Sequence, residues 1–341
     1  MIRVGLIGVG FIGRNHFNQY ARLGERARIV AICDSDPKRR RGDWSEGGGN
    51  IGDTAARVQD LGDIRSYERV EEILADGDVD MVDITVPTFL HAEMTIAALR
   101  AGKHVLCEKP MALTVKDCDR MIQAARKSRK LLMIAQCIRF WPEYVWLKQA
   151  IDDRRYGRLR ALSLRRQAST PDWTWDSWAL NAKRSGGAIL DLHVHDVDYA
   201  LWVLGKPRSV TAQGWGRRSG IDRVHSLWEY RSGPVVYLEG WWDAPKAFGF
   251  NMGFTAVFDR AAVVWDLNTG KPLTIMTSDG RSETPQLAGG DGYYGEIDYF
   301  VSCIERGQRP TTSTPRDSRD AVAIALAEAR SIRTGKAVAV R

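Results

Sequence analysis

Hydrophobic positions change their spacing about 140 residues into the chain, so the sequence divides into two parts. In the first part, short apolar runs alternate with segments of helical periodicity. This alternation is typical of βαβ units, which build an α/β fold with a doubly wound parallel sheet and helices on both faces. The expected strands are 1–7, 28–33, 79–86, 104–108 and 131–136, and the expected helices are 14–23, 89–100 and 115–128.

After Arg139 the pattern becomes strand-like, with turn signals such as Ser232–Gly233–Pro234 between apolar runs. Such turns favour an α+β domain with a large, open, mainly antiparallel sheet and helices on one face. We expect domains at 1–139 and 140–341, since single cores seldom exceed about 250–300 residues. The expected strands are 159–167, 209–215, 225–230, 235–242, 251–258, 262–267 and 273–277, and the expected helices are 140–151, 294–305 and 318–333.

Within the second part, segment 185–207 has two interleaved stripes at helical spacing. They predict one amphipathic helix that lies across the sheet and faces the first domain. Asp191 and His195 are four residues apart, so this helix would present a carboxylate and an imidazole on one face. The apolar stripe is Leu190, Val194, Val197, Leu201 and Leu204, and the second stripe is Asp191, His195, Asp198 and Trp202.

A glycine pattern, G-x-G-x-x-G, follows the first expected strand and precedes a helix. The first glycine permits a tight turn, the second lets backbone approach a pyrophosphate, and the third allows close packing of helix and strand. Asp34 ends the second expected strand, where it can accept both hydroxyls of an adenosine ribose. We expect a Rossmann domain that binds NAD, with NADP left open by the nearby Lys38 and Arg39. The expected loop residues are Gly8, Gly10, Phe11, Ile12 and Gly13.

Net charge, apolar runs and cysteine spacing exclude several classes of partner. The formal net charge is +7, but the basic residues form short separated groups, so we expect no nucleic-acid partner. The chain has no apolar run of bilayer length and no signal-peptide pattern, which predicts no membrane partner and a cytoplasmic location. The five cysteines lack a C-x-x-C pair and are expected to be reduced. We expect no metal site, because His193 and His195 would point about 200° apart on a helix.

Lys109 stands in an E-K-P motif after an expected strand, at the sheet edge where ligands bind in doubly wound folds. Over essentially its full length, the chain resembles the glucose-fructose oxidoreductase, inositol dehydrogenase and rhizopine-catabolism family. The resemblance implies an NAD(P)-dependent dehydrogenase or reductase acting on CH–OH groups of sugars, inositols or related polyols. It also implies a homo-oligomer, a dimer or tetramer, through the second domain's sheet. The motifs that carry it are Gly8–Gly13, Asp34, Thr85–Thr88 with His91, Glu108–Pro110, and Gly186–Gly187 through Asp191 and His195.

The resemblance also implies roles for single residues. Lys109 would be the catalytic lysine, Asp191 the substrate-binding aspartate and His195 the acid/base histidine. His193 stands where many relatives carry glycine, which suggests an altered substrate pocket. The residues implied at the cofactor are Thr85, Pro87, His91, Glu108 and Lys109, with a satisfied helix-start histidine equally open for His91. The candidates for substrate contact are Arg139, Trp173, Trp175, Trp178 and His193, with core or interface packing equally open for the tryptophans.

Two other functions stay open. One is an oxidoreductase that retains its cofactor and uses redox transiently on a sugar derivative. The other is a non-catalytic NAD(P)-binding regulator, since a fold does not fix a function. Segment 41–63, with Gly47–Asn50, is expected to be a loop insertion whose role the sequence does not indicate.

Overall fold

The computed structural model describes residues 1–46, 48–49, 51 and 57–340, which form two compact units. Each unit is built from three separate segments of the chain. The prediction of domains at 1–139 and 140–341 has the chain pass from one domain to the other only once. The first unit consists of Met1–Cys137, Trp173–Trp178 and Asp291–Arg319, and the second of Ile138–Asp172, Ala179–Gly290 and Asp320–Arg341.

The first unit is built on a six-stranded parallel sheet in the order β5-β2-β1-β6-β7-β8. Counted along its own strands this order is 3-2-1-4-5-6, so the predicted Rossmann fold is confirmed. The order reverses between β1 and β6, and such folds bind ligands outside the carboxyl ends of the strands at that point. The strands are β1 (Ile2–Ile7), β2 (Ala27–Cys33), β5 (Arg65–Tyr67), β6 (Met81–Ile84), β7 (His104–Glu108) and β8 (Leu132–Ala135).

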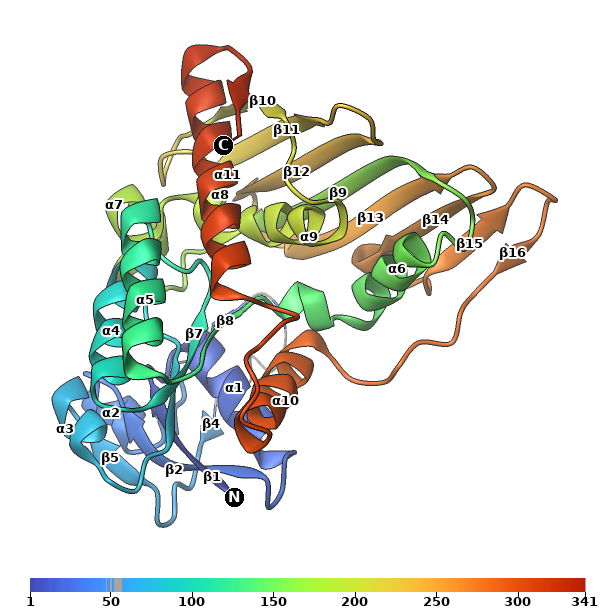
Figure 1. The fold of residues 1–341 in the computed structure, drawn as a ribbon. Helices are drawn as coiled ribbons and strands as arrows, with labels where there is room; N and C mark the ends of the chain where they lie inside the picture. The colour runs from blue at the N-terminus through green and yellow to red at the C-terminus, as the bar shows by residue number, and fades with distance from the viewer. Residues whose placement is uncertain (47, 50, 52–56, 341) are drawn as a thin grey trace. The chain divides into compact units, whose positions relative to one another are not determined.

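Helices cover this sheet on both sides. Figure 1 shows α3, α4 and α5 on one side of the strands and α1 and α10 on the other. Ile297 and Phe300 of α10 are fully buried in the same core as Leu6 of β1. The helices are α1 (Phe11–Ala21), α2 (Pro37–Arg40), α3 (Val70–Ala75), α4 (His91–Arg100), α5 (Val115–Ser128), α10 (Gly292–Glu305) and the start of α11 (Pro315–Thr334).

Segment 41–63 contains a short hairpin of β3 (Asp43–Trp44) and β4 (Arg57–Val58), which pair antiparallel. Gly47, Asn50 and residues 52–56 of the predicted insertion lie outside the described residues. The insertion is therefore characterised only at its two flanks and at Gly48, Gly49 and Ile51.

The second unit contains a nine-stranded sheet in the order β16-β15-β14-β13-β9-β12-β11-β10-β17. Only β9 and β12 run parallel among its paired strands in the part of the chain described, so the mainly antiparallel sheet is confirmed. The strands are β9 (Leu159–Ser169), β10 (Ser209–Trp215), β11 (Arg223–Glu229), β12 (Val235–Ala244), β13 (Phe250–Phe258), β14 (Ala261–Asp266), β15 (Thr274–Thr277), β16 (Ser282–Glu283) and β17 (Val338–Ala339).

Helices of the second unit pack on this sheet. α8 contacts β11 and β12, and α9 contacts β9 and β12, so this segment lies across the middle strands as predicted (Figure 1). α6 packs against α9. The helices are α6 (Pro142–Asp152), α7 (Ala182–Ser185), α8 (Ala188–Asp191), α9 (Val194–Leu204) and the rest of α11.

All five cysteines are buried, and none of them forms a disulfide in this structure. Among the helices in the described ranges, none combines the length and the apolar character needed to cross a membrane.

Candidate active site

The loop after β1 is shaped by glycines where a side chain would not fit. Gly8 has a φ of +92°, and a Cβ there would lie 2.9 Å from Val86 Cγ1. At Gly13 a Cβ would lie 2.0 Å from the Gly8 carbonyl oxygen, so only glycine lets α1 pack this closely. At Gly10 a Cβ would meet no atom within 4 Å. The loop is therefore close-packed behind and open at Gly10, as the approach of a pyrophosphate requires.

The N-terminus of α1 adds hydrogen-bond donors to this loop. α1 begins at Phe11, and its N-cap Gly10 provides no side-chain cap. The first N–H groups of a helix lack intrahelical partners and attract anions. Phe11, Ile12 and Gly13 supply these groups, so the residues present fit a dinucleotide phosphate. Gly49 of the insertion lies against the Phe11 ring, where a Cβ would be 2.1 Å from Cε2.

Asp34 follows β2 at the same edge of the sheet. Its Oδ2 accepts the N–H of Val9 at 2.7 Å, and its Oδ1 accepts the N–H of Asp36 at 2.9 Å. A carboxylate has about four lone-pair sites, so both oxygens keep capacity for ribose hydroxyls. Arg39 lies 3.9 Å from Oδ2, so it neutralises part of this charge. These contacts fix Asp34 beside the glycine loop, where an adenosine ribose would be recognised.

Basic residues after Asp34 are engaged in ion pairs. Lys38 Nζ lies 3.2 Å from Glu46, and an Arg40 guanidinium nitrogen lies 2.9 Å from Glu68. A 2′-phosphate would have to compete with these carboxylates for the two cations. These exposed pairs compete only weakly, so the carboxylate of Asp34, which repels a 2′-phosphate, is the feature that favours NAD over NADP.

The loop after β6 is held by Thr85 and His91. Thr85 Oγ1 donates to the Gly8 carbonyl at 2.6 Å. His91 is 1% exposed, with Nδ1 2.8 Å from the Pro110 carbonyl and Nε2 2.8 Å from the Val86 carbonyl. Burial lowers the pKa of His91. A neutral imidazole donates to only one of these two carbonyls, and the burial of His91 between the two loops supports the alternative of a packed helix-start histidine.

Lys109 directly follows β7 at the carboxyl edge of the sheet. Its backbone N–H donates to Glu108 Oε2 at 3.0 Å, and its peptide bond to Pro110 is cis. Glu108 is 5% exposed, whereas Lys109 is partly exposed. Pro87, in the loop after β6, is also partly exposed.

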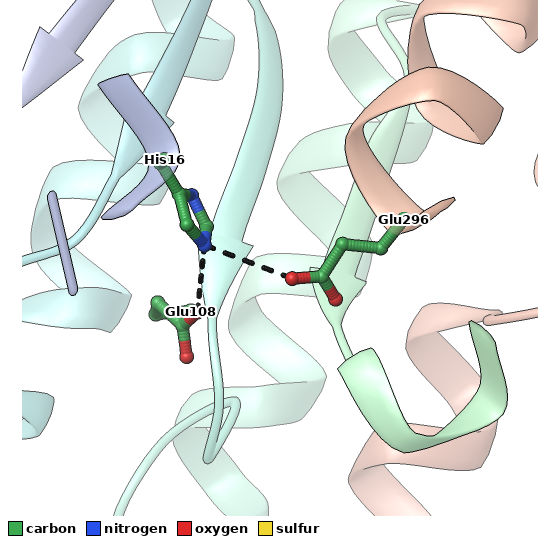
Figure 2. A group of neighbouring side chains, drawn as sticks. All are labelled: His16, Glu108 and Glu296. Carbon is green, nitrogen blue, oxygen red and sulfur yellow. Dashed lines mark ion pairs between the residues drawn. The ribbon is translucent and has the colours of Figure 1, made fainter. Parts of the chain in front are cut away.

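A buried group of ionisable side chains surrounds Glu108, and no sequence pattern points to the whole group. Figure 2 shows His16 of α1 beside Glu108 of β7 and Glu296 of α10, with one atom of each within 4.8 Å of the others. An imidazole with two carboxylates has the donor types of a divalent-cation site, although the sequence predicts no metal. His16 is a polar residue on the buried face of α1. A histidine at such a position in an expected helix is the sequence signal that could have pointed to this group.

Segment 185–207 forms two helices, α8 and α9, so the single helix predicted there is wrong. The break falls at Leu192–His193, where the His193 N–H bonds to the Ala188 carbonyl, five residues back, at 2.8 Å. This bond is a single π-type turn, which interrupts the regular hydrogen-bond pattern between α8 and α9. Asp191 and His195 are both partly exposed, unlike the buried residues between them.

Two predicted substrate contacts are buried within the second unit. Arg139 forms a bidentate pair with Asp198 at 2.6 and 2.7 Å, and the two side chains are 0% and 1% exposed. His193 is 0% exposed, and its Nε2 lies 3.0 Å from Glu328. The structure therefore supports packing roles for Arg139 and His193.

The tryptophan segment 173–178 groups with the first unit. Trp173 lies against Gly48, where a Cβ would be 2.8 Å from the Trp173 Cβ. Trp175 is 47% exposed and Trp178 is partly exposed. Lys109 also belongs to the first unit, but Asp191 and His195 belong to the second, so convergence of these three side chains stays a prediction.

Sheet order, glycine loop and Asp34 together define the first unit as an NAD-binding Rossmann domain. The sequence also matches models of a known protein family. Residues 2–136 match the oxidoreductase family with NAD-binding Rossmann fold (GFO/IDH/MocA), and residues 144–278 match the GFO/IDH/MocA C-terminal domain. The chain belongs to this oxidoreductase family, and the predicted resemblance is confirmed.

Individual relatives extend the match over most of the chain. The 1,5-anhydro-D-fructose reductase of Ensifer adhaerens is 31% identical over 84% of this chain and 87% of its own. Inositol 2-dehydrogenase of Rhizobium meliloti (strain 1021) is 27% identical over 99% of each chain. A solved levoglucosan dehydrogenase, in complex with NADH and levoglucosan, has a TM-score of 0.81 at 24% identity over 99% of each chain, which is a likeness of fold.

Proposed function

We propose that this protein transfers hydride between NAD and a secondary alcohol of a sugar, inositol or related polyol. The observation that carries the proposal is Lys109, directly after β7, at the same sheet edge as the glycine loop that fits the cofactor. The names of the relatives, an inositol 2-dehydrogenase and an anhydrofructose reductase, support this substrate class.

In the proposed oxidation, the alcohol carbon loses a hydride, its oxygen loses a proton, and a carbonyl forms. NAD, when bound, supplies the hydride acceptor. His195 takes the hydroxyl proton, because an imidazole titrates near neutrality. Lys109 donates a hydrogen bond to the same oxygen and stabilises the negative charge that develops there. Asp191 binds a neighbouring hydroxyl or orients the imidazole.

A substrate panel tests this function. Polyols, aldoses and inositols are each combined with NAD and with NADP, and reduced cofactor is followed by its absorbance. We expect turnover with at least one compound and a preference for NAD. Absence of turnover with every pair would favour a cofactor-retaining enzyme if nicotinamide is released on denaturation, and a regulator if it is not.

The Lys109→Ala variant tests the assigned role. We expect kcat to fall by at least about 100-fold, since removing one stabilising donor typically costs this much, while NAD affinity changes little. Lys127→Ala is the matched control, because Lys127 is an exposed lysine of α5 in the same unit. Full turnover in Lys109→Ala would contradict the proposed mechanism.

We also propose a cytoplasmic homo-oligomer that associates through the nine-stranded sheet. Apolar side chains exposed on its strands support this surface: Leu227 is 52%, Val257 39% and Met276 42% exposed. Exposed apolar patches on a protein often mark interfaces. Light scattering after gel filtration should give a dimer or tetramer, and Leu227→Lys should shift it towards the monomer.

A further inference from the structure

A buried set of ionisable side chains in the first unit takes no part in the proposed reaction. Its four members come from four elements and are each 5% exposed or less. They are His16 (α1), Asp83 (β6), Glu108 (β7) and Glu296 (α10). Ionised groups so far from water are costly unless they are paired.

Both nitrogens of the His16 imidazole face carboxylates. Nδ1 lies 2.9 Å from Asp83. Nε2 lies 3.2 Å from Glu108 and 3.7 Å from Glu296, the two contacts drawn in Figure 2. A cationic imidazole is attracted by carboxylates on both sides, and the contacts of Nε2 lie at ion-pair distance without hydrogen-bond geometry. Burial lowers the pKa of His16, but the charges of Asp83 and Glu108 outweigh it and raise this pKa well above its ordinary value. Tyr20 completes the surroundings by donating to Asp83 at 2.9 Å.

Glu296 is buried beside the other carboxylates of this set. It is 0% exposed, and neither carboxylate oxygen has a hydrogen-bond partner among the described residues. Burial, together with the charges of Glu108 and Asp83, raises the pKa of Glu296 well above its ordinary value. A divalent cation held by His16, Glu108 and Glu296 is the alternative. Because water can complete the shell of a zinc ion that has three protein ligands, the metal content of the purified protein, rather than the number of ligands, separates protons from a cation.

Glu108 connects this buried set to the backbone of the active-site lysine. One carboxylate oxygen faces His16, and the other accepts the Lys109 N–H at 3.0 Å. We propose that His16 is a positioning residue: it holds Glu108 in the conformation that binds the Lys109 N–H, and so sets the direction in which the lysine side chain leaves β7. The inference rests on the proposed role of Lys109. A displacement of about 1 Å at a catalytic group can reduce turnover about 100-fold.

Replacements of Glu108 test this link. Glu108→Ala removes the acceptor, and Glu108→Asp shortens the arm by one methylene, so we expect kcat to fall about tenfold or more in both. Glu108→Gln keeps an oxygen that can accept the Lys109 N–H but loses the charge that attracts the His16 imidazole, so its kcat should fall, by less than that of Glu108→Ala. The dissociation constant for NAD, measured by fluorescence titration, should stay within about threefold in all three.

A double-mutant cycle tests whether His16 acts through Glu108. We expect His16→Gln to lower kcat about tenfold in the natural chain but less than about twofold in the Glu108→Ala background. Ser313→Ala is the control for general destabilisation, because Ser313 is 0% exposed and donates to the Ile134 carbonyl in the same unit. It should lower Tm and leave kcat unchanged.

The outcomes separate this inference from the proposed function. Unchanged kcat in Glu108→Ala, or additive losses in the cycle, would overturn the positioning role while an inactive Lys109→Ala preserves the proposed function. An active Lys109→Ala would overturn both. One equivalent of a divalent metal in the purified protein, lost in Glu296→Gln, would overturn the proton-based arrangement in favour of a metal site.

Discussion

Asp34 illustrates how one side chain can select the cofactor. Its carboxylate is held by the N–H groups of Val9 and Asp36, with capacity left for a ribose. A hydrogen bond to a charged group contributes about 1.5–3 kcal/mol, so Asp34→Ala should lower kcat/KM for NAD about 10- to 100-fold. The loss with NADP should be smaller, because the repulsion of a 2′-phosphate disappears with the carboxylate. Equal losses with the two cofactors would show that Asp34 acts only through the loop.

Several polar residues predicted at the site turn out to be occupied by partners inside the protein. His91 is held by two carbonyls, Arg139 by Asp198 and His193 by Glu328. A buried polar group requires a partner because its desolvation is costly. From the sequence, however, a histidine with such a partner looks the same as one that faces a ligand.

At the scale of elements, the N-cap of α8 is a glycine with a backbone conformation that residues with a side chain rarely adopt. Gly187 has φ 79° and ψ −178°, and a Cβ there would lie 2.7 Å from the Ser219 carbonyl oxygen. Gly205, after α9, has nearly the same backbone angles, φ 74° and ψ −172°, with no atom within 4 Å of a Cβ.

This pair gives a matched prediction. Gly205→Ala should cost about 1–3 kcal/mol of unfolding free energy from backbone strain alone. Gly187→Ala adds a steric clash with a carbonyl and should cost at least about 1 kcal/mol more. Denaturant unfolding of both variants measures the difference, and equal losses would contradict the clash.

Sequence patterns predicted the bounds of some elements to the residue. The predicted ranges 104–108, 115–128 and 209–215 coincide with β7, α5 and β10. β5 and α3 escaped prediction because three- and six-residue elements carry little periodicity. The break between α8 and α9 was missed because its wider turn leaves the apolar stripe almost intact. Of that stripe, Leu190, Val194, Val197 and Leu201 are buried.

At the scale of the whole molecule, His104 should make stability depend on pH. Its Nδ1 accepts the Leu131 N–H at 3.1 Å, and burial, with Lys130 nearby, lowers the pKa of His104 to about 4. The unfolded chain, with a histidine pKa of about 6.5, therefore binds the proton first. The contribution is complete above pH 6.5 and is lost as the pH falls towards 4.

His104→Asn tests this dependence, because the Asn oxygen can accept the same N–H without titrating. The advantage in unfolding free energy of the natural chain over the variant should shrink by about 1 kcal/mol between pH 7 and pH 5, after allowance for solvent screening. Denaturant unfolding at the two pH values measures the change. A constant difference would mean that His104 does not titrate in this range.

The sequence by itself determined the Rossmann fold class, the glycine loop, Asp34 and the position of Lys109, because these depend on local periodicity and on residues close together in the chain. Only the tertiary structure decided that α10 covers the first unit and that His16, Glu108 and Glu296 form one buried group. Such pairings join segments hundreds of residues apart, and no periodic pattern encodes them. They arise because each buried charge must find a partner among the side chains that packing brings near it.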